Sequence, residues 1–195
     1  MSAIASDVAP ATGAGGRTVR ILVWDLPVRV FHWLLAASFA GAYWLSETER
    51  LRNVHVNLGY AVLGLVAFRV VWGFTGTRFA RFRSFLYSPR EALDYLSGLA
   101  GHSGRRFLGH NPAGSYAIWA ILGLAALTGV TGYATYNDIG GDALEELHEF
   151  LANAWLWVVG LHVAGVVVSS LAHRENLVRS MITGYKRADG AAVRD

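Results

Sequence analysis

Residues 144–172 of the chain read LEELHEFLANAWLWVVGLHVAGVVVSSLA, the longest of four apolar stretches. This stretch exceeds the roughly 20 apolar residues that an α-helix needs to cross a bilayer. It holds two histidines, His148 and His162, which are 14 residues apart. A helix turns through about 1400° over that interval, close to four full turns, and rises about 21 Å. Both imidazoles therefore lie on one face of the predicted helix, at two depths of a membrane.

The composition is typical of a membrane protein. Hydrophobic residues make up 53% of the 195-residue chain and charged residues only 16%, whereas soluble domains carry about 25% charged residues. The length suits a single domain. The chain has no cysteine, which excludes disulfides, cysteine-bound iron–sulfur clusters and covalently attached c-type haem. Membrane lipid is thus an expected partner, and nucleic acid is not.

Four apolar stretches predict transmembrane helices, at residues 27–46, 53–74, 112–136 and 144–172. Short loops join the first helix to the second and the third to the fourth, so these pairs should be antiparallel neighbours. Residues 1–19 are small and polar and predict a disordered tail. The expected fold is all-α: an integral membrane four-helix bundle over residues 20–187, followed by a C-terminal tail at 188–195.

The basic residues gather at one end of this predicted bundle. The N-terminal segment, the loop between the second and third spans and the C-terminal tail are all rich in arginine. The loop between the third and fourth spans has no Lys or Arg and carries the acidic residues Asp138, Asp142, Glu145, Glu146 and Glu149. The positive-inside rule therefore predicts a multi-pass protein with both termini in the cytoplasm.

A short helix is expected between the second and third spans. Ser88-Pro89-Arg90-Glu91 forms a capping box with proline at the first helical position. Leu93, Leu96 and Leu99 follow at a spacing of three residues. The pattern predicts a short amphipathic helix on the cytoplasmic membrane surface. A solvated linker helix is the alternative.

Four histidines fall at two depths of the predicted bundle. His55 and His148 lie at the outer starts of their helices, and His32 and His162 lie in the cytoplasmic half. Neutral imidazole is a good axial ligand for haem iron, and two imidazoles make a six-coordinate centre suited to electron transfer. We therefore predict an inner haem on His32 and His162 and an outer haem on His55 and His148. The alternative is that each histidine only hydrogen-bonds between helices.

Three further polar residues accompany these pairs. Arg69 lies 14 residues after His55, on nearly the same helix face and at the depth of the inner pair. It would hold the propionates of the inner haem, or its guanidinium would instead extend to the interface. His110 is expected to cap the third helix, with a quinone or propionate contact as the alternative. His173 is expected to be an interfacial residue.

An ordered set of short motifs carries a family resemblance. These are VWDLPVRVFHW at 23–33, HVNLG at 55–59, RVVWG at 69–73, GHNPAG at 109–114, ELHE at 146–149, GLH at 160–162, ENLV at 175–178 and TGYKR at 183–187. The set resembles the bacterial cytochrome b561 proteins and the b-type cytochrome subunits of nickel–iron hydrogenases. The resemblance implies a four-helix cytochrome of the bacterial inner membrane with two haems b, and its four ligands fall on His32, His55, His148 and His162.

Three functions follow from these observations. The first is transmembrane electron transfer between the quinone pool and a redox partner of a respiratory chain, such as a periplasmic c-type cytochrome, for which the acidic outer loop would suit a basic docking surface. The second is a haem-bearing membrane anchor of a larger hydrogenase or dehydrogenase. The third and most remote is a metal transporter lined by histidines. Quinone oxidoreductase activity and a homodimer are left open.

Overall fold

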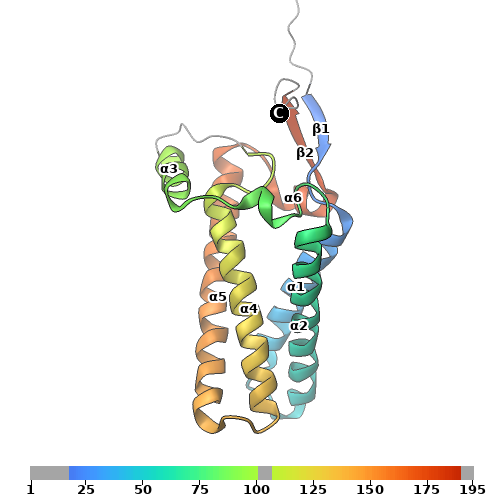
Figure 1. Cartoon of the computed structure of the whole chain (residues 1–195), viewed down its shortest axis with the longest axis vertical. Helices are drawn as coiled ribbons and strands as arrows, with labels where there is room; N and C mark the ends of the chain where they lie inside the picture. The colour runs from blue at the N-terminus through green and yellow to red at the C-terminus, as the bar shows by residue number, and fades with distance from the viewer. Residues whose placement is uncertain (1–17, 101–106, 190–195) are drawn as a thin grey trace, which may run out of the picture.

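Four long helices form the body of the molecule (Figure 1). The structure is a computed structural model that describes residues 18–100 and 107–189. The helices are α1 (Leu26–Leu45), α2 (Arg52–Thr75), α4 (Pro112–Tyr136) and α5 (Gly141–Ala172). Helix α1 packs on α2, α2 on α4, and α4 on α5. Each helix matches one predicted span, and the largest difference is at α5, which begins at Gly141 rather than at residue 144.

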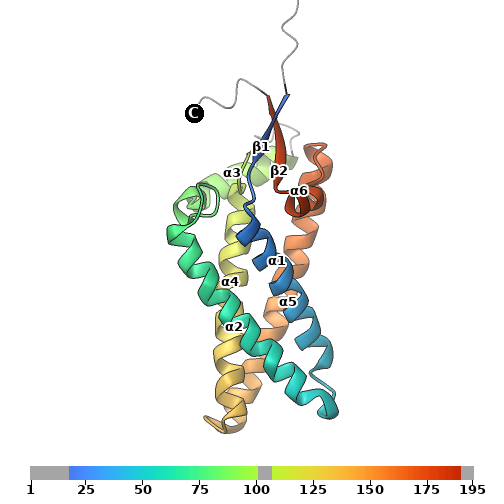
Figure 2. The same ribbon diagram turned by 90° about the vertical axis from the view of Figure 1, so that its right-hand side faces the viewer.

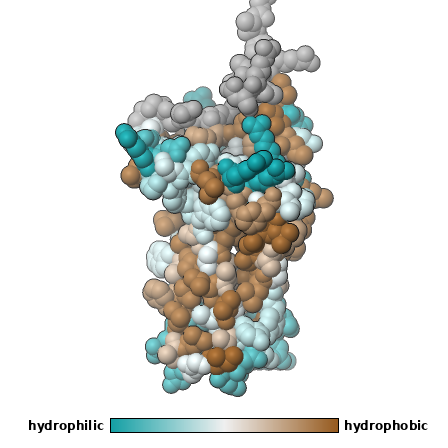
Figure 3. Space-filling view, viewed as in Figure 1, coloured by the Kyte–Doolittle hydropathy of each residue, from teal (hydrophilic) through white to brown (hydrophobic). Residues whose placement is uncertain are grey.

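Three of these helices are long and apolar enough to cross a membrane. They are Glu49–Thr75, Pro112–Tyr136 and Gly141–Ala172. Only 11% of the residues in the most apolar part of α5 are buried inside the protein, so most of its apolar side chains face outward. Figure 3 shows the resulting hydrophobic band between two more polar ends. Helix α1 carries Arg29 and His32, which lower its hydropathy, so a fourth span stays a prediction from the sequence.

Asp25 fixes the start of α1 against the end of α2. Its Oδ1 accepts a hydrogen bond from the Val28 amide at 2.9 Å and so caps the helix. Its Oδ2 accepts hydrogen bonds from Trp72 Nε1 at 3.0 Å and from Thr77 Oγ1 at 2.7 Å. This carboxylate is buried and fully partnered, which is the condition under which a buried acid is tolerated.

An aromatic contact lies at mid-bundle, between the two histidine depths. Phe39 of α1 and Trp155 of α5 are both buried, and their ring centroids are 4.0 Å apart. Val62 of α2 and Ala125 of α4 complete this layer. Trp155 lies seven residues from each histidine of α5, so an apolar layer separates the outer pair of histidines from the inner pair.

The structure contains a small antiparallel sheet, which the all-α prediction did not include. Strand β1 (Thr18–Leu22) pairs with β2 (Tyr185–Asp189), with Thr18 opposite Asp189 and Leu22 opposite Tyr185. Helix α6 (Leu177–Thr183) leads into β2 through Gly184, whose φ is 87°. The two strands lie together beyond one end of the bundle (Figures 1 and 2). Most of the predicted tails, at residues 1–17 and 190–195, lie outside the described residues.

The short helix between the second and third spans is confirmed as α3 (Pro89–Ala100). The Glu91 amide donates to Ser88 Oγ, and the Ser88 amide donates to Glu91 Oε2 at 2.7 Å, as a capping box requires. These bonds from Ser88 hold the pKa of Glu91 below its ordinary value. Helix α3 lies across the end of the bundle (Figures 1 and 2) and leaves Leu93 and Leu96 exposed, as a helix resting on lipid would.

Candidate haem-binding site

The outer pair of histidines meets between α2 and α5. The ring centroids of His55 and His148 are 6.2 Å apart, and the two rings are nearly perpendicular, at 84°. The helices carry the two residues near their first turns, His55 three positions after the start of α2 and His148 seven after the start of α5. Two side chains that are 93 positions apart in sequence are thus brought to one place.

The ring of His55 is held by the end of α1. The carbonyl of Ala42 lies 2.8 Å from His55 Nδ1. This carbonyl lacks its usual partner within the helix, because the amide of Ser46 donates to Tyr43 instead. A carbonyl can only accept, so Nδ1 carries the proton and Nε2 presents a lone pair. A hydrogen bond of this kind fixes the tautomer and the orientation of metal-binding histidines.

The ring of His148 is held in the same way by α4. The carbonyl of Thr128 lies 3.0 Å from His148 Nδ1, and the hydroxyl of Thr131 lies 3.3 Å from the same nitrogen. Gly132 leaves the space for the ring, because a Cβ at this position would lie 2.8 Å from His148 Cε1. Both outer imidazoles therefore keep Nε2 available while Nδ1 is anchored to a neighbouring helix.

This geometry fits one metal ion bound between two imidazoles. Two metal–nitrogen bonds of about 2 Å, with about 1 Å from each nitrogen to its ring centre, span roughly 6 Å. Within residues 18–100 and 107–189, no group of three or more His, Cys, Asp or Glu side chains could hold a metal ion. A porphyrin supplies four nitrogens of its own, so a pair of histidines is sufficient for haem iron.

The inner pair is arranged differently. His32 of α1 and His162 of α5 lie close enough to interact electrostatically, but among the described residues no ring contact between them is found. His32 Nδ1 is buried and has no hydrogen-bond partner. The structure thus brings the two residues to one region of the bundle without joining their rings.

Arg69 is buried rather than extended to the interface. Its side chain is only 3% exposed, and its guanidinium packs on the rings of Phe82 and Phe85 at 4.9 and 5.8 Å. Nη2 donates to the carbonyl of Ala80 at 3.0 Å, whereas Nη1 is buried without a partner. One donor of a buried cation is therefore left for an acidic group, and a propionate would suit it.

His110 lies beside Arg69 and does not cap α4. Asn111 is the cap, because its Oδ1 accepts from the amide of Gly114. The imidazole of His110 packs on Trp24 and Phe85, with ring centroids 4.6 and 4.5 Å apart, and its Nδ1 is buried without a partner. Burial, together with the nearby charge of Arg69, lowers the pKa of His110 to about 3, so this ring is neutral at physiological pH.

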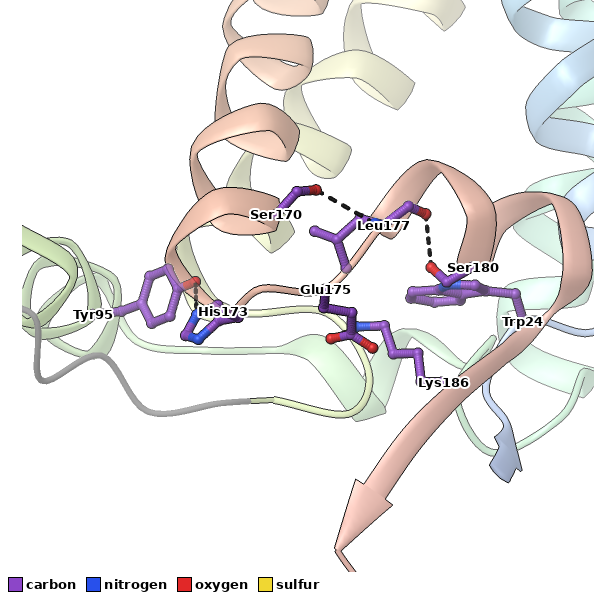
Figure 4. A network of polar contacts seen from close by, with 8 residues as sticks. All are labelled: Trp24, Tyr95, Ser170, His173, Glu175, Leu177, Ser180 and Lys186. Carbon is purple, nitrogen blue, oxygen red and sulfur yellow. Dashed lines mark hydrogen bonds and ion pairs between the residues drawn. The ribbon is translucent and has the colours of Figure 1, made fainter. Parts of the chain in front are cut away.

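His173 is a structural residue at the junction of α3 and α5. Its Nε2 lies 3.4 Å from the hydroxyl of Tyr95, and this contact docks α3 onto the end of the bundle (Figure 4). The position agrees with the expectation of an interfacial residue.

Sequence reasoning missed several groups that position the site. The carbonyls of Ala42 and Thr128 belong to the backbone and leave no side-chain signal. Asp25 could have been identified, because an acidic residue directly before Leu26-Pro27 is a typical N-cap followed by proline in the first turn. Trp155 is one of many aromatic residues in the spans, and only packing distinguishes it.

Comparison with known proteins identifies the family of the chain. The family model of the prokaryotic cytochrome b561 proteins matches residues 23–184. Relatives include two proteins named probable Ni/Fe-hydrogenase B-type cytochrome subunit. The one from Rhizobium leguminosarum bv. viciae is 24% identical over 85% of this chain and 88% of its own length. The one from Rhodobacter capsulatus is 22% identical over 87% of this chain and 82% of its own length.

A third relative is the probable Ni/Fe-hydrogenase 1 B-type cytochrome subunit of Escherichia coli (strain K12), 21% identical over 84% of this chain and 89% of the relative. No solved structure gives a significant match. The family match spans all four long helices and all four predicted ligands. The chain therefore belongs to the prokaryotic cytochrome b561 family, and it is a haem b protein of a bacterial membrane that transfers electrons.

Proposed function

We propose that the protein carries electrons across the bacterial inner membrane through two haems b, between the quinone pool and a redox partner. The observation that supports the proposal is the outer pair, in which the ring centroids of His55 and His148 are 6.2 Å apart and each Nδ1 is anchored to a carbonyl. When bound, haem b supplies an iron that gains and loses one electron. Two axial imidazoles leave that iron no open position for oxygen or substrate, which suits electron transfer.

The roles of the surrounding residues follow from their contacts. Ala42 and Thr128 hold the outer imidazoles in one tautomer and make their Nε2 atoms more basic. His32 and His162 would ligate the inner haem, and His162 lies about 21 Å from His148 along α5 by the helical rise. Arg69 Nη1 and His110 Nδ1 would then find their partners in the inner haem's acidic groups or in a bound quinone.

The orientation of the protein in the membrane follows from the distribution of its basic and acidic residues. With both termini in the cytoplasm, the acidic loop around Asp138 and Glu145 faces the periplasm beside the outer haem. The inner haem then lies toward the end that bears β1, β2 and α3. Electrons would pass between these two surfaces through the mid-bundle layer of Phe39 and Trp155.

A second function is favoured by the names of the relatives, which are subunits of Ni/Fe hydrogenases. In that case this chain is the membrane anchor of a larger redox enzyme and exchanges electrons with it directly. The haem chemistry is the same, but the partner is permanent. Purification from native membranes in mild detergent distinguishes the two, because only the anchor would retain a catalytic subunit in fixed stoichiometry.

The test of the di-haem proposal is spectroscopic. We expect two haems b per chain, measured as haem content against protein, with a bis-histidine signature in reduced-minus-oxidised spectra. A histidine-lined metal transporter would instead bind divalent metal and give no haem spectrum. One haem per folded chain, in cells supplied with haem, would contradict the proposal.

A further inference from the structure

A basic pocket lies where the two ends of the chain meet. It has a volume of about 280 Å³ and is formed by the end of α5, helix α6 and strands β1 and β2. Its charged lining residues are Arg20, Arg174, Glu175, Arg179, Lys186 and Arg187. None of the six belongs to the haem site, so this pocket is unexplained by electron transfer.

The lining carries far more positive than negative charge. Glu175 is the single acid among the lining residues, and it faces Lys186 with their charged atoms 3.8 Å apart (Figure 4). Both side chains are largely buried, Lys186 being 5% and Glu175 14% exposed. The remaining four lining charges are all arginine, and guanidinium groups bind phosphate through paired hydrogen bonds.

The strand register adds a second observation. Arg20 of β1 lies directly opposite Arg187 of β2, and like charges in that position destabilise a sheet. The Arg20 guanidinium lies 4.9 Å over the ring of Tyr185, which holds it at the pocket. The register thus places two cationic side chains of the pocket on neighbouring strands, where both can contact one bound anion.

The pocket lies next to exposed apolar side chains at the end of the bundle. Arg174 lies two residues after the end of α5, whose last turn exposes Leu171. Helix α6 presents Val178 and Ile182, which are 50% and 55% exposed, beside the arginines of the pocket. Exposed apolar side chains next to a cationic pocket suit a ligand with an anionic head and apolar tails.

We propose that this pocket binds the phosphate of an anionic phospholipid. The lipid would join the β1–β2 sheet and α6 to the end of α5 and so hold the terminal cap against the bundle. The proposal rests on the membrane location of the family and not on which residues ligate haem. A free phosphate ion would be recognised by the same charges, and the experiment separates the two sources.

The experiment uses the full chain purified in detergent, titrated with phosphatidylglycerol or phosphatidylcholine and read by native mass spectrometry. We expect one tightly bound phosphatidylglycerol and no comparable phosphatidylcholine. The double substitution Arg174→Gln with Arg179→Gln should weaken phosphatidylglycerol binding about tenfold or more. The matched control, Arg83→Gln with Arg90→Gln, removes the same charge from exposed positions of the same end outside the pocket and should bind as the parent does.

Three outcomes would overturn the proposal. Equal weakening by both double substitutions would mean that general surface charge attracts the lipid. Displacement of the lipid by millimolar inorganic phosphate would assign the pocket to the free ion. Equal binding of the two lipids would leave no role for the arginines. Haem absorbance of the same samples is recorded separately, so a failure of the di-haem proposal does not alter the reading of lipid binding.

Discussion

The two histidine pairs are held by different means. In the outer pair, both Nδ1 atoms of His55 and His148 are bonded to backbone carbonyls, and the ring centroids lie 6.2 Å apart. In the inner region, His32 Nδ1, Arg69 Nη1 and His110 Nδ1 are all buried without a partner. The protein alone organises the outer pair, whereas the inner region leaves polar groups that only a bound molecule would satisfy.

This difference concerns stability as well as binding. A buried polar group without a partner costs about 1–3 kcal/mol, and three such groups lie together in the inner region. The imidazoles of the outer pair carry no such cost at Nδ1, because these hydrogen bonds exist before any cofactor binds, and the unpartnered group beside them is the neutral hydroxyl of Thr128. We therefore expect the inner haem to contribute more to folding than the outer haem, although each would have two axial histidines.

The largest effect is expected from removing one ligand of each pair. His162→Ala should abolish the inner haem, leave the outer one, and destabilise the bundle by several kcal/mol, at about 1–3 kcal/mol for each unpaired group. His148→Ala should abolish the outer haem with a smaller loss of stability, because His55 keeps its bond to Ala42. Haem content and thermal unfolding in detergent measure both effects.

A larger loss of stability in His148→Ala than in His162→Ala would contradict this explanation of the two pairs. If His162→Ala removed both haems from a bundle that still folds by circular dichroism, the assignment of one ligand to each depth would be wrong.

The next effect concerns the space beside His148. Gly132→Ala places a Cβ 2.8 Å from His148 Cε1, so the ring must leave the Thr128 carbonyl. We expect the outer haem to bind about 10–100-fold more weakly, as when an orienting partner is lost, with the inner haem unchanged. Haem titration of the purified protein measures the change.

Gly123→Ala is the matched control on the same helix. A Cβ at Gly123 meets no atom within 4 Å, and alanine is a better helix former than glycine. This variant should retain both haems with equal or higher thermal stability. Loss of the outer haem in both variants would show that helix α4 tolerates no added methyl group, and the explanation from His148 would fail.

A smaller effect is expected from the charge of the inner region. Arg69→Gln removes a buried cation, and a cation near haem stabilises the reduced iron. The inner midpoint potential should therefore fall, by about 60 mV for a tenfold change in the one-electron equilibrium, while the outer potential stays constant. Redox titration resolves the two. The matched control, Arg83→Gln, removes an exposed charge and should leave both midpoint potentials unchanged. An equal shift of both potentials in Arg69→Gln would contradict the assignment of Arg69 to the inner site.

The long helices were the most predictable part of the molecule. Apolar length determines where a span can lie, so α2 and α4 were located within one residue at each end. Capping residues were equally informative at Ser88 and Glu91, whose mutual hydrogen bonds are present as expected. Local rules suffice for such elements because all the interacting groups are close in sequence.

Tertiary features were less predictable. Strands β1 and β2 are five residues each and pair across more than 160 positions, so neither has a strong pattern of its own. Depth matching predicted that His55 faces His148, and their rings are 6.2 Å apart, although their role as ligands stays a prediction. The carbonyl of Ala42 that orients His55 could not be predicted, because every residue has a carbonyl and only the fold selects one.

The smallest effect is expected from Thr131→Val, which tests whether the Thr131 hydroxyl or the Thr128 carbonyl holds the ring of His148. Thr131 Oγ1 lies 3.3 Å from His148 Nδ1, but it is also 2.9 Å from the carbonyl of Leu127, to which it donates. The Thr128 carbonyl is the closer partner of the ring, at 3.0 Å. Thr131→Val keeps the shape of the side chain and removes only its hydroxyl, so the outer haem should remain bound.

Its midpoint potential should shift by less than about 20 mV, the equivalent of about 0.5 kcal/mol for one electron. Redox titration of Thr131→Val beside Gly132→Ala makes the comparison direct. If Thr131→Val lost the outer haem as completely as Gly132→Ala, the hydroxyl rather than the Thr128 carbonyl would be the anchor of the ring. The outer pair would then depend on a side chain that can rotate, and it would no longer differ from the inner pair in being organised by the backbone.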